Sequence, residues 1–180
     1  MKFLPYSILM LTLFGGFTGC TNNGITQKAE NERANEEPTI EDSFNLKMEF
    51  QKQISLALNN WHQAAATANT DAFYGFMTKD CIYLGTDPSE KWYRDELKEW
   101  AAFAFERDTA WAFTPYNRGL YFAKDLSTAW FDEKLSTEKM GECRGSGVLV
   151  LTKNGWKLKH YNLSVTILNE KMDDFLEIKQ

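Results

Sequence analysis

The feature that most constrains the fold is a series of strand-like runs in the last third of the chain. Three runs, 127–135, 144–152 and 156–168, are rich in β-branched and aromatic residues and are separated by short polar segments. Asn154-Gly155, between the last two runs, is typical of a hairpin turn because both residues accept a positive φ. With a further strand beginning at Trp111, we predict a meander of four antiparallel strands.

The residues before these strands have the period of helices. Apolar side chains recur every three or four residues from Phe44 to Ala68, which predicts one long amphipathic helix. A shorter helix is predicted from Asp71 to Met77, followed by a brief strand from Cys81 to Leu84.

A third helix is predicted to begin at Asp87-Pro88-Ser89-Glu90. Asp87 is the expected N-cap, Pro88 suits the first helical position and Glu90 the third, as in a capping box. A short last helix is predicted from Lys171 to Ile178. Helices that precede an antiparallel sheet and cover one of its faces make an α+β domain.

A set of motifs is spread over residues 47–170: Trp61, Asp71, residues 84–92 (LGTDPSEKW), Arg118, residues 129–133, residues 144–147 and residues 156–164. Together they resemble a known family, the SnoaL-like branch of the nuclear transport factor 2-like superfamily. The resemblance implies a cone-shaped α+β fold, with N-terminal helices packed on a bent antiparallel sheet, an internal pocket and a homodimer formed through the sheet. It implies no single activity, because this fold hosts isomerases, dehydratases, cyclases, adaptors and binding-only domains.

The N-terminal residues have the form of a bacterial export signal. Residues 1–19 hold a single charge, Lys2, and an apolar run from Ile8 to Phe17 that is shorter than the ~20 residues a spanning helix needs. Thr18-Gly19-Cys20 resembles a lipobox, although Phe17 stands where Leu is usual. We therefore expect a signal peptide over 1–19, a lipidated Cys20, and a protein anchored to a membrane of the cell envelope, the outer membrane facing the periplasm. The alternatives are an ordinary secretory signal and a spanning anchor.

The segment from Cys20 to residue 43 has almost no large apolar side chains and carries six acidic groups against two basic ones. Such a composition predicts a disordered tether, about 25 to 30 Å from end to end. Residues 44–180 then form the SnoaL-like domain, with a net charge of about −2. Dispersed basic residues and a negative net charge argue against nucleic acid as a partner.

Two cysteines remain in the domain once Cys20 is lipidated. Cys81 and Cys143 could form a disulfide in an oxidising compartment, or they could be two separately buried thiols. No spacing of potential ligands suggests a metal, and no cofactor is expected.

Strand register predicts which charged groups share the pocket. If residues 136–141 close a simple hairpin, Glu133 lies across from Arg144. The preceding turn then places Tyr116 and Arg118 beside Glu133.

The last hairpin allows two registers. A two-residue turn at 154–155 and a three-residue turn at 153–155 put opposite faces of the strand inward. We favour the three-residue turn, which keeps His160 and Asn162 on the face of Arg144. In the family, a His is frequent where Asn162 stands, so an acid-base role there is not expected, although Asn can still orient a ligand.

These positions define the candidate site and three classes of function. The favoured class is a membrane-tethered domain that binds a small molecule with a carboxylate or carbonyl group, without turnover. Its expected ligand-binding residues are Tyr116, Arg118, Glu133, Arg144 and Asn162.

The first alternative is an isomerase, cyclase or dehydratase with Glu133 as general base and Tyr116 or His160 as proton donor. Two facing arginines would keep the pKa of Glu133 low, which argues against this role. The second alternative is an interaction module that uses the sheet surface. The structural alternative for Glu133 and Arg144 is an ion pair, and His62 is expected at the surface.

Overall fold

The computed structural model describes residues 39–178. The predicted signal peptide, Cys20 and most of the predicted tether lie outside these residues. No described helix has the length and apolar character needed to cross a membrane.

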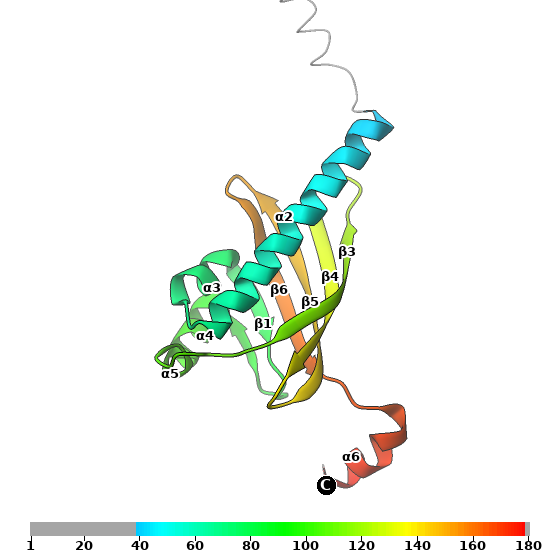
Figure 1. The fold of residues 1–180 in the computed structure, drawn as a ribbon. Coiled ribbons are helices and arrows are strands. Elements are labelled where there is room, and N and C mark those ends of the chain that lie inside the picture. The colour runs from blue at the N-terminus through cyan, green and yellow to red at the C-terminus, as the bar shows by residue number, and fades with distance from the viewer. Residues whose placement is uncertain (1–38, 179–180) are drawn as a thin grey trace, which may run out of the picture. The chain divides into compact units, whose positions relative to one another are not determined.

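The first described element is the long helix α2 (Ile40–Ala66), which lies across one face of the sheet (Figure 1). It begins four residues before the predicted start at Phe44. Its apolar stripe is buried only in the second half, where Ile54, Leu58 and Trp61 pack on the sheet, whereas Phe44 is 60% exposed. The amphipathic pattern therefore predicted the helix correctly, but the sheet covers only part of it.

A short helix and the first strand follow α2. Helix α3 (Thr70–Phe76) is capped by Asn69, whose side-chain oxygen accepts a hydrogen bond from the Ala72 N–H at 3.0 Å. Strand β1 (Met77–Leu84) continues directly from it. Both elements were predicted from the sequence, the strand with a later start.

The prediction of a helix start at Asp87 is wrong. The Asp87 carboxylate accepts from the Ser89 N–H at 2.8 Å, and the Glu90 carboxylate accepts from the Asp87 N–H at 3.2 Å. The Glu90 bond is one half of a capping box, but here both bonds close a turn that leads into strand β2 (Lys91–Tyr93), which pairs with β1. Helix α4 (Arg94–Trp100) begins only afterwards, where the Glu96 carboxylate accepts from the Tyr93 N–H, and α5 (Ala102–Phe105) follows.

The four remaining strands form the predicted meander: β3 (Thr114–Phe122), β4 (Thr128–Thr137), β5 (Gly141–Thr152) and β6 (Gly155–Val165). The six described strands have the order β2-β1-β6-β5-β4-β3. All neighbours are antiparallel except β1 and β6, which are parallel, so the sheet is mixed and not purely antiparallel as predicted. The predicted last helix is confirmed as α6 (Met172–Ile178), after the short 3₁₀ turn η1 (Asn169–Lys171).

The two faces of the sheet differ sharply. On the inner face, Phe131, Leu149 and Tyr161 are buried with the second half of α2. On the outer face, Tyr121 and Trp130 are each 46% exposed and stack with ring centroids 6.0 Å apart. Helices on one face of a bent sheet confirm the predicted α+β class.

The β5–β6 hairpin follows neither predicted turn. Thr152 pairs with Gly155, so the connecting residues are Lys153 and Asn154. The register then shifts by one residue between Val148 and Leu149, because Lys159 is an extra residue in β6. This bulge restores the predicted pairing of residues 144, 146 and 148 with 164, 162 and 160, but on the outer face of the sheet.

Candidate functional site

Three charged or titratable side chains meet inside the domain, and we call them the ionic cluster: Arg118, Glu133 and His62. One carboxylate oxygen of Glu133 lies 2.6 Å from His62 Nε2. The other accepts from Arg118 Nε and Nη2, each at 2.7 Å. The Glu133 side chain is 0% exposed, so these groups satisfy a charge that has no access to water.

Glu133 reaches the interior because it occupies an inward position of β4, between the buried Phe131 and Leu135. Its partner across the β4–β5 pair is Gly145. A Cβ at Gly145 would lie 2.6 Å from the Tyr161 hydroxyl, so only glycine leaves room for that ring beside the cluster. The pKa of Tyr161 lies well above its usual value, mainly because the hydroxyl is buried. Neighbouring charges, Glu133 among them, raise this pKa further.

Arg118 enters the cluster through a bulge in β3. Asn117 has a φ of +48°, and the register with β4 shifts between Tyr116 and Gly119. Asn tolerates this left-handed conformation better than most residues. The bulge turns Arg118 inward, where Nη1 also donates to the Ser55 carbonyl of α2 at 3.0 Å. The predicted contact between Arg118 and Glu133 is therefore present.

His62 completes the cluster, although the sequence pattern predicted it at the surface. It is 6% exposed, and its ring lies 5.3 Å from that of Trp61. Because α2 lies in the concave side of the sheet, a wider arc of the helix is buried than a single stripe. Ala64 and Ala65, close to His62 in the sequence, are also buried. Small residues at these positions were the sequence signal that the helix packs closely over a wider face.

The sheet register contradicts the rest of the predicted site. Arg144 pairs with Lys134, one position away from Glu133, so it lies on the outer face. Thr137 pairs with Gly141, so the register of β4 and β5 differs by one residue from the predicted hairpin, in which Glu133 faced Arg144. A shift of one residue moves every side chain of a strand to the opposite face.

Tyr116, His160 and Asn162 also lie on the outer face, away from Glu133. Tyr116 pairs with Lys134, and its hydroxyl contacts the Glu142 carboxylate. His160 pairs with Val148, and Asn162 with Ser146, both on the side of Arg144. The five predicted residues therefore do not line one pocket, and neither predicted proton donor is near Glu133.

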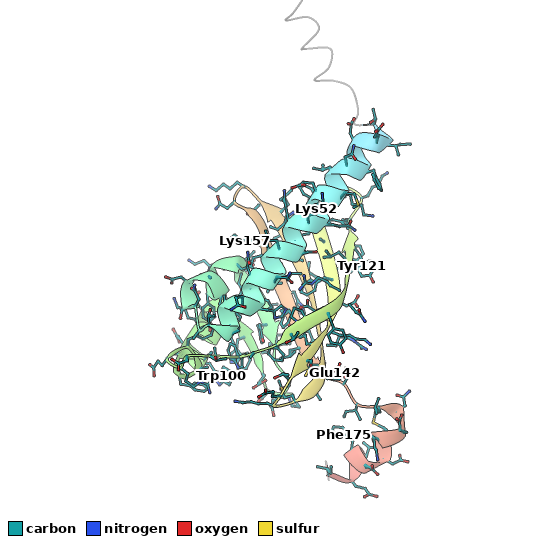
Figure 2. The ribbon with its side chains drawn as sticks, viewed as in Figure 1. Lys52, Trp100, Tyr121, Glu142, Lys157 and Phe175 are labelled. Carbon is teal, nitrogen blue, oxygen red and sulfur yellow. The ribbon has the colours of Figure 1, made fainter. Side chains whose placement is uncertain are left out.

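A cavity with a different lining lies at the end of the domain formed by β2, α4 and α5. We call it the aromatic pocket; its volume is about 300 Å³. Its aromatic walls are Tyr83, Trp92, Trp100, Phe103, Trp111 and Phe113. Figure 2 shows Trp100 at this end and Tyr121 on β3 at the other side of the domain. Such a lining suits a planar apolar molecule.

The aromatic walls are supported by the packing around them. The Trp92 and Trp100 ring centroids lie 4.4 Å apart, and Trp111 contacts the rings of Phe73 and Phe105 at 5.8 and 5.4 Å. These contacts tie the wall to the core, so part of the pocket is formed before any ligand binds. The sequence showed the tryptophans, but only the fold brings them together.

Three charged residues also line the aromatic pocket: Glu90, Arg107 and Lys139. The Glu90 carboxylate lies over Gly85, because a Cβ placed on Gly85 would be 2.0 Å from a carboxylate oxygen of Glu90. It is close enough to Tyr83 that its charge adds to the effect of burial in raising the pKa of that hydroxyl. The pocket thus combines an apolar wall with a few polar groups, as ligand sites commonly do.

The described residues show separate thiols and no metal cluster. Cys81 and Cys143 are both free and buried, so the alternative of two separate thiols holds. Burial raises the pKa of Cys81 to about 12. Between residues 39 and 178, no three His, Cys, Asp or Glu side chains are arranged to hold a metal ion.

Comparison with known proteins identifies one family and many solved structures with a similar fold. The family described as "SnoaL-like domain" matches residues 54–168. No curated protein matches the sequence.

Several solved structures have a similar fold at low sequence identity. A putative scytalone dehydratase from Novosphingobium aromaticivorans aligns with a TM-score of 0.58 at 14% identity, over 69% of this chain and 89% of that one. A cystatin-like domain of unknown function from Nostoc punctiforme aligns at 0.59 and 12%, over 71% and 83%. An NTF2-like protein of unknown function from Pseudomonas putida aligns at 0.56 and 12%, over 67% and 89%. These likenesses establish the cone-shaped fold alone.

Proposed function

The chain belongs to the SnoaL-like domain family, and on this premise we propose that it binds a small organic molecule in the aromatic pocket without converting it. The observation that carries the proposal is a cavity of about 300 Å³ walled by six aromatic side chains. Burying one face of a planar ligand against such rings removes apolar surface from water, at about 25 cal/mol per Å².

The state of Glu133 supports binding over catalysis. A general base must reach the proton it removes, within about 3 Å of a substrate atom. The Glu133 side chain is fully buried, and both of its oxygens are engaged by His62 and Arg118. The proton donors that an enzyme of this design would use, Tyr116 and His160, lie on the opposite face. The ionic cluster is better explained as a structural element.

A matched pair of tryptophan variants tests the proposal. Trp100, in the pocket, and Trp130, on the outer face, are 44% and 46% exposed, so they differ mainly in location. The fluorescent probe N-phenyl-1-naphthylamine should bind the purified protein at one saturable site. Trp100→Ala should weaken this binding about tenfold, because a stacking face is lost, while Trp130→Ala should leave it unchanged. Equal effects of the two variants would contradict the proposal.

We also propose that the domain is held at a bacterial membrane through Cys20. The support is the short apolar run that ends at Gly19-Cys20, followed by a polar, acidic segment. Several acyl chains on one residue hold a protein firmly to a bilayer. The pocket would then sample ligands within the envelope, close to the membrane surface.

We also propose that the domain forms a homodimer through the outer face, and one observation favours this assembly. Tyr121 and Trp130 form a stacked aromatic pair that is nearly half exposed. Exposed aromatic pairs of this kind are enriched at protein interfaces. Light scattering of the purified domain tests this assembly, and a monomer at tens of micromolar would contradict it.

A further inference from the structure

Arg107 is the charged residue of the aromatic pocket with the most constrained geometry. It follows α5, and its Nε donates to the Ala104 carbonyl at 3.3 Å, while Nη2 donates to the Ala110 carbonyl at 3.0 Å. Its guanidinium also lies over the Phe103 ring, 5.8 Å from the centroid. Two hydrogen bonds and a ring contact hold the group in one orientation at the pocket wall.

The donors that remain on Arg107 match an anionic group with two acceptor oxygens. A guanidinium has five N–H donors, of which two are used by the carbonyls of Ala104 and Ala110. The remaining three belong to Nη1 and Nη2, the end of the fork that meets a carboxylate or sulfonate with two parallel bonds. Because the side chain is already oriented, less rotamer entropy is lost when an anion binds.

Arg107 also makes no salt bridge within the part of the chain that the structure describes. Among residues 39–178, no carboxylate lies within salt-bridge distance of it. Lys139, from the β4–β5 turn, adds a second positive charge to the pocket lining. The carboxylate of the lining, Glu90, instead accepts from the Asp87 N–H and covers Gly85.

We infer that the ligand of the aromatic pocket is an organic anion, with a planar apolar body against the tryptophans and a carboxylate or similar group on Arg107. This inference rests on the proposed function and specifies its ligand class. Arg107 takes the anion-binding role that the sequence had assigned to Arg118 and Arg144. Arg118 cannot fill it because Glu133 already occupies its fork, and Arg144 lies on the outer face.

Two probes that differ by a single charged group test this assignment. N-phenyl-1-naphthylamine is neutral, and 8-anilinonaphthalene-1-sulfonate is the same aromatic framework with a sulfonate. The purified protein should bind the sulfonate about tenfold more tightly. Arg107→Gln should remove this preference and leave the affinity for the neutral probe unchanged.

Arg144→Gln is the matched control, because it removes the same charge from the outer face of the sheet. It should leave both affinities unchanged. If Arg107→Gln weakens both probes equally, or neither, while both still depend on Trp100, the anion assignment is wrong and the pocket proposal stands. If neither probe binds at a site sensitive to Trp100→Ala, the proposed function fails, and the ligand assignment fails with it.

Discussion

Replacing Arg118 by Met tests whether the ionic cluster is a structural element. Met has a similar length and can fill the same space, so the change removes the charge and five donors with little loss of volume. Glu133 would keep His62 as its partner, yet remain fully buried. The perturbation therefore isolates the contribution of the guanidinium to a charge that has no access to water.

The magnitude follows from the burial of the pair. The Glu133 side chain is 0% exposed and that of Arg118 is 12% exposed, so solvent screens neither of them well. Removing one partner of a buried pair costs about 3 to 5 kcal/mol of unfolding free energy. The double variant Arg118→Met with Glu133→Leu removes both charges. It should lose only about 1 to 3 kcal/mol of unfolding free energy, because buried His62 loses its hydrogen-bond partner.

Urea unfolding followed by tryptophan fluorescence measures these free energies by linear extrapolation. Arg144→Met is the control, because Arg144 is exposed on the outer face, and it should change stability by less than about 0.5 kcal/mol. A loss below about 1 kcal/mol for Arg118→Met would refute the argument. The double variant no longer buries the Glu133 carboxylate, so it should be more stable than Arg118→Met alone. A double variant that is less stable than Arg118→Met would also contradict the argument.

Three further predictions concern the anchor, the outer face and the thiols. Cys20→Ser should move the protein out of the membrane fraction or leave it as an uncleaved precursor; failure of a palmitate analogue to label the wild-type chain would refute lipidation at this residue. Trp130→Glu should weaken self-association in light scattering, because a charge in an apolar interface must be desolvated without a partner. Cys81 and Cys143 should not react with a thiol reagent at pH 7.5 unless urea is added, since both are buried and burial raises the pKa of each thiol. Rapid labelling of either cysteine in the native protein would show that the core opens there.

The sequence predicted the elements well because their signals are local. The apolar period of α2, the meander from β3 to β6 and the helix α6 were all found from residue patterns. Asp87 misled the prediction of α4, because its capping bonds close a turn as readily as they start a helix. Pairing of Lys91–Tyr93 with β1 decided between the two, and such pairing is not a local property.

The candidate site was harder to predict because it depends on register. A one-residue difference in the β4–β5 turn placed Arg144 outside, and the bulge at Asn117 placed Arg118 inside. The aromatic pocket joins Tyr83 of β1 to Phe113, thirty residues later, and no period within either segment indicates that they meet. His62 was missed because the width of the buried arc on α2 is set by the curvature of the sheet.

The most direct test of ligand binding in the aromatic pocket uses the indole N–H signals of the six tryptophans in a nitrogen-15 NMR spectrum. Each signal can be assigned by substituting one tryptophan at a time. Adding N-phenyl-1-naphthylamine should shift the signals of Trp92, Trp100 and Trp111, which line the pocket, and leave that of Trp130 in place. A shift of the Trp130 signal with none at the three pocket tryptophans would contradict the account.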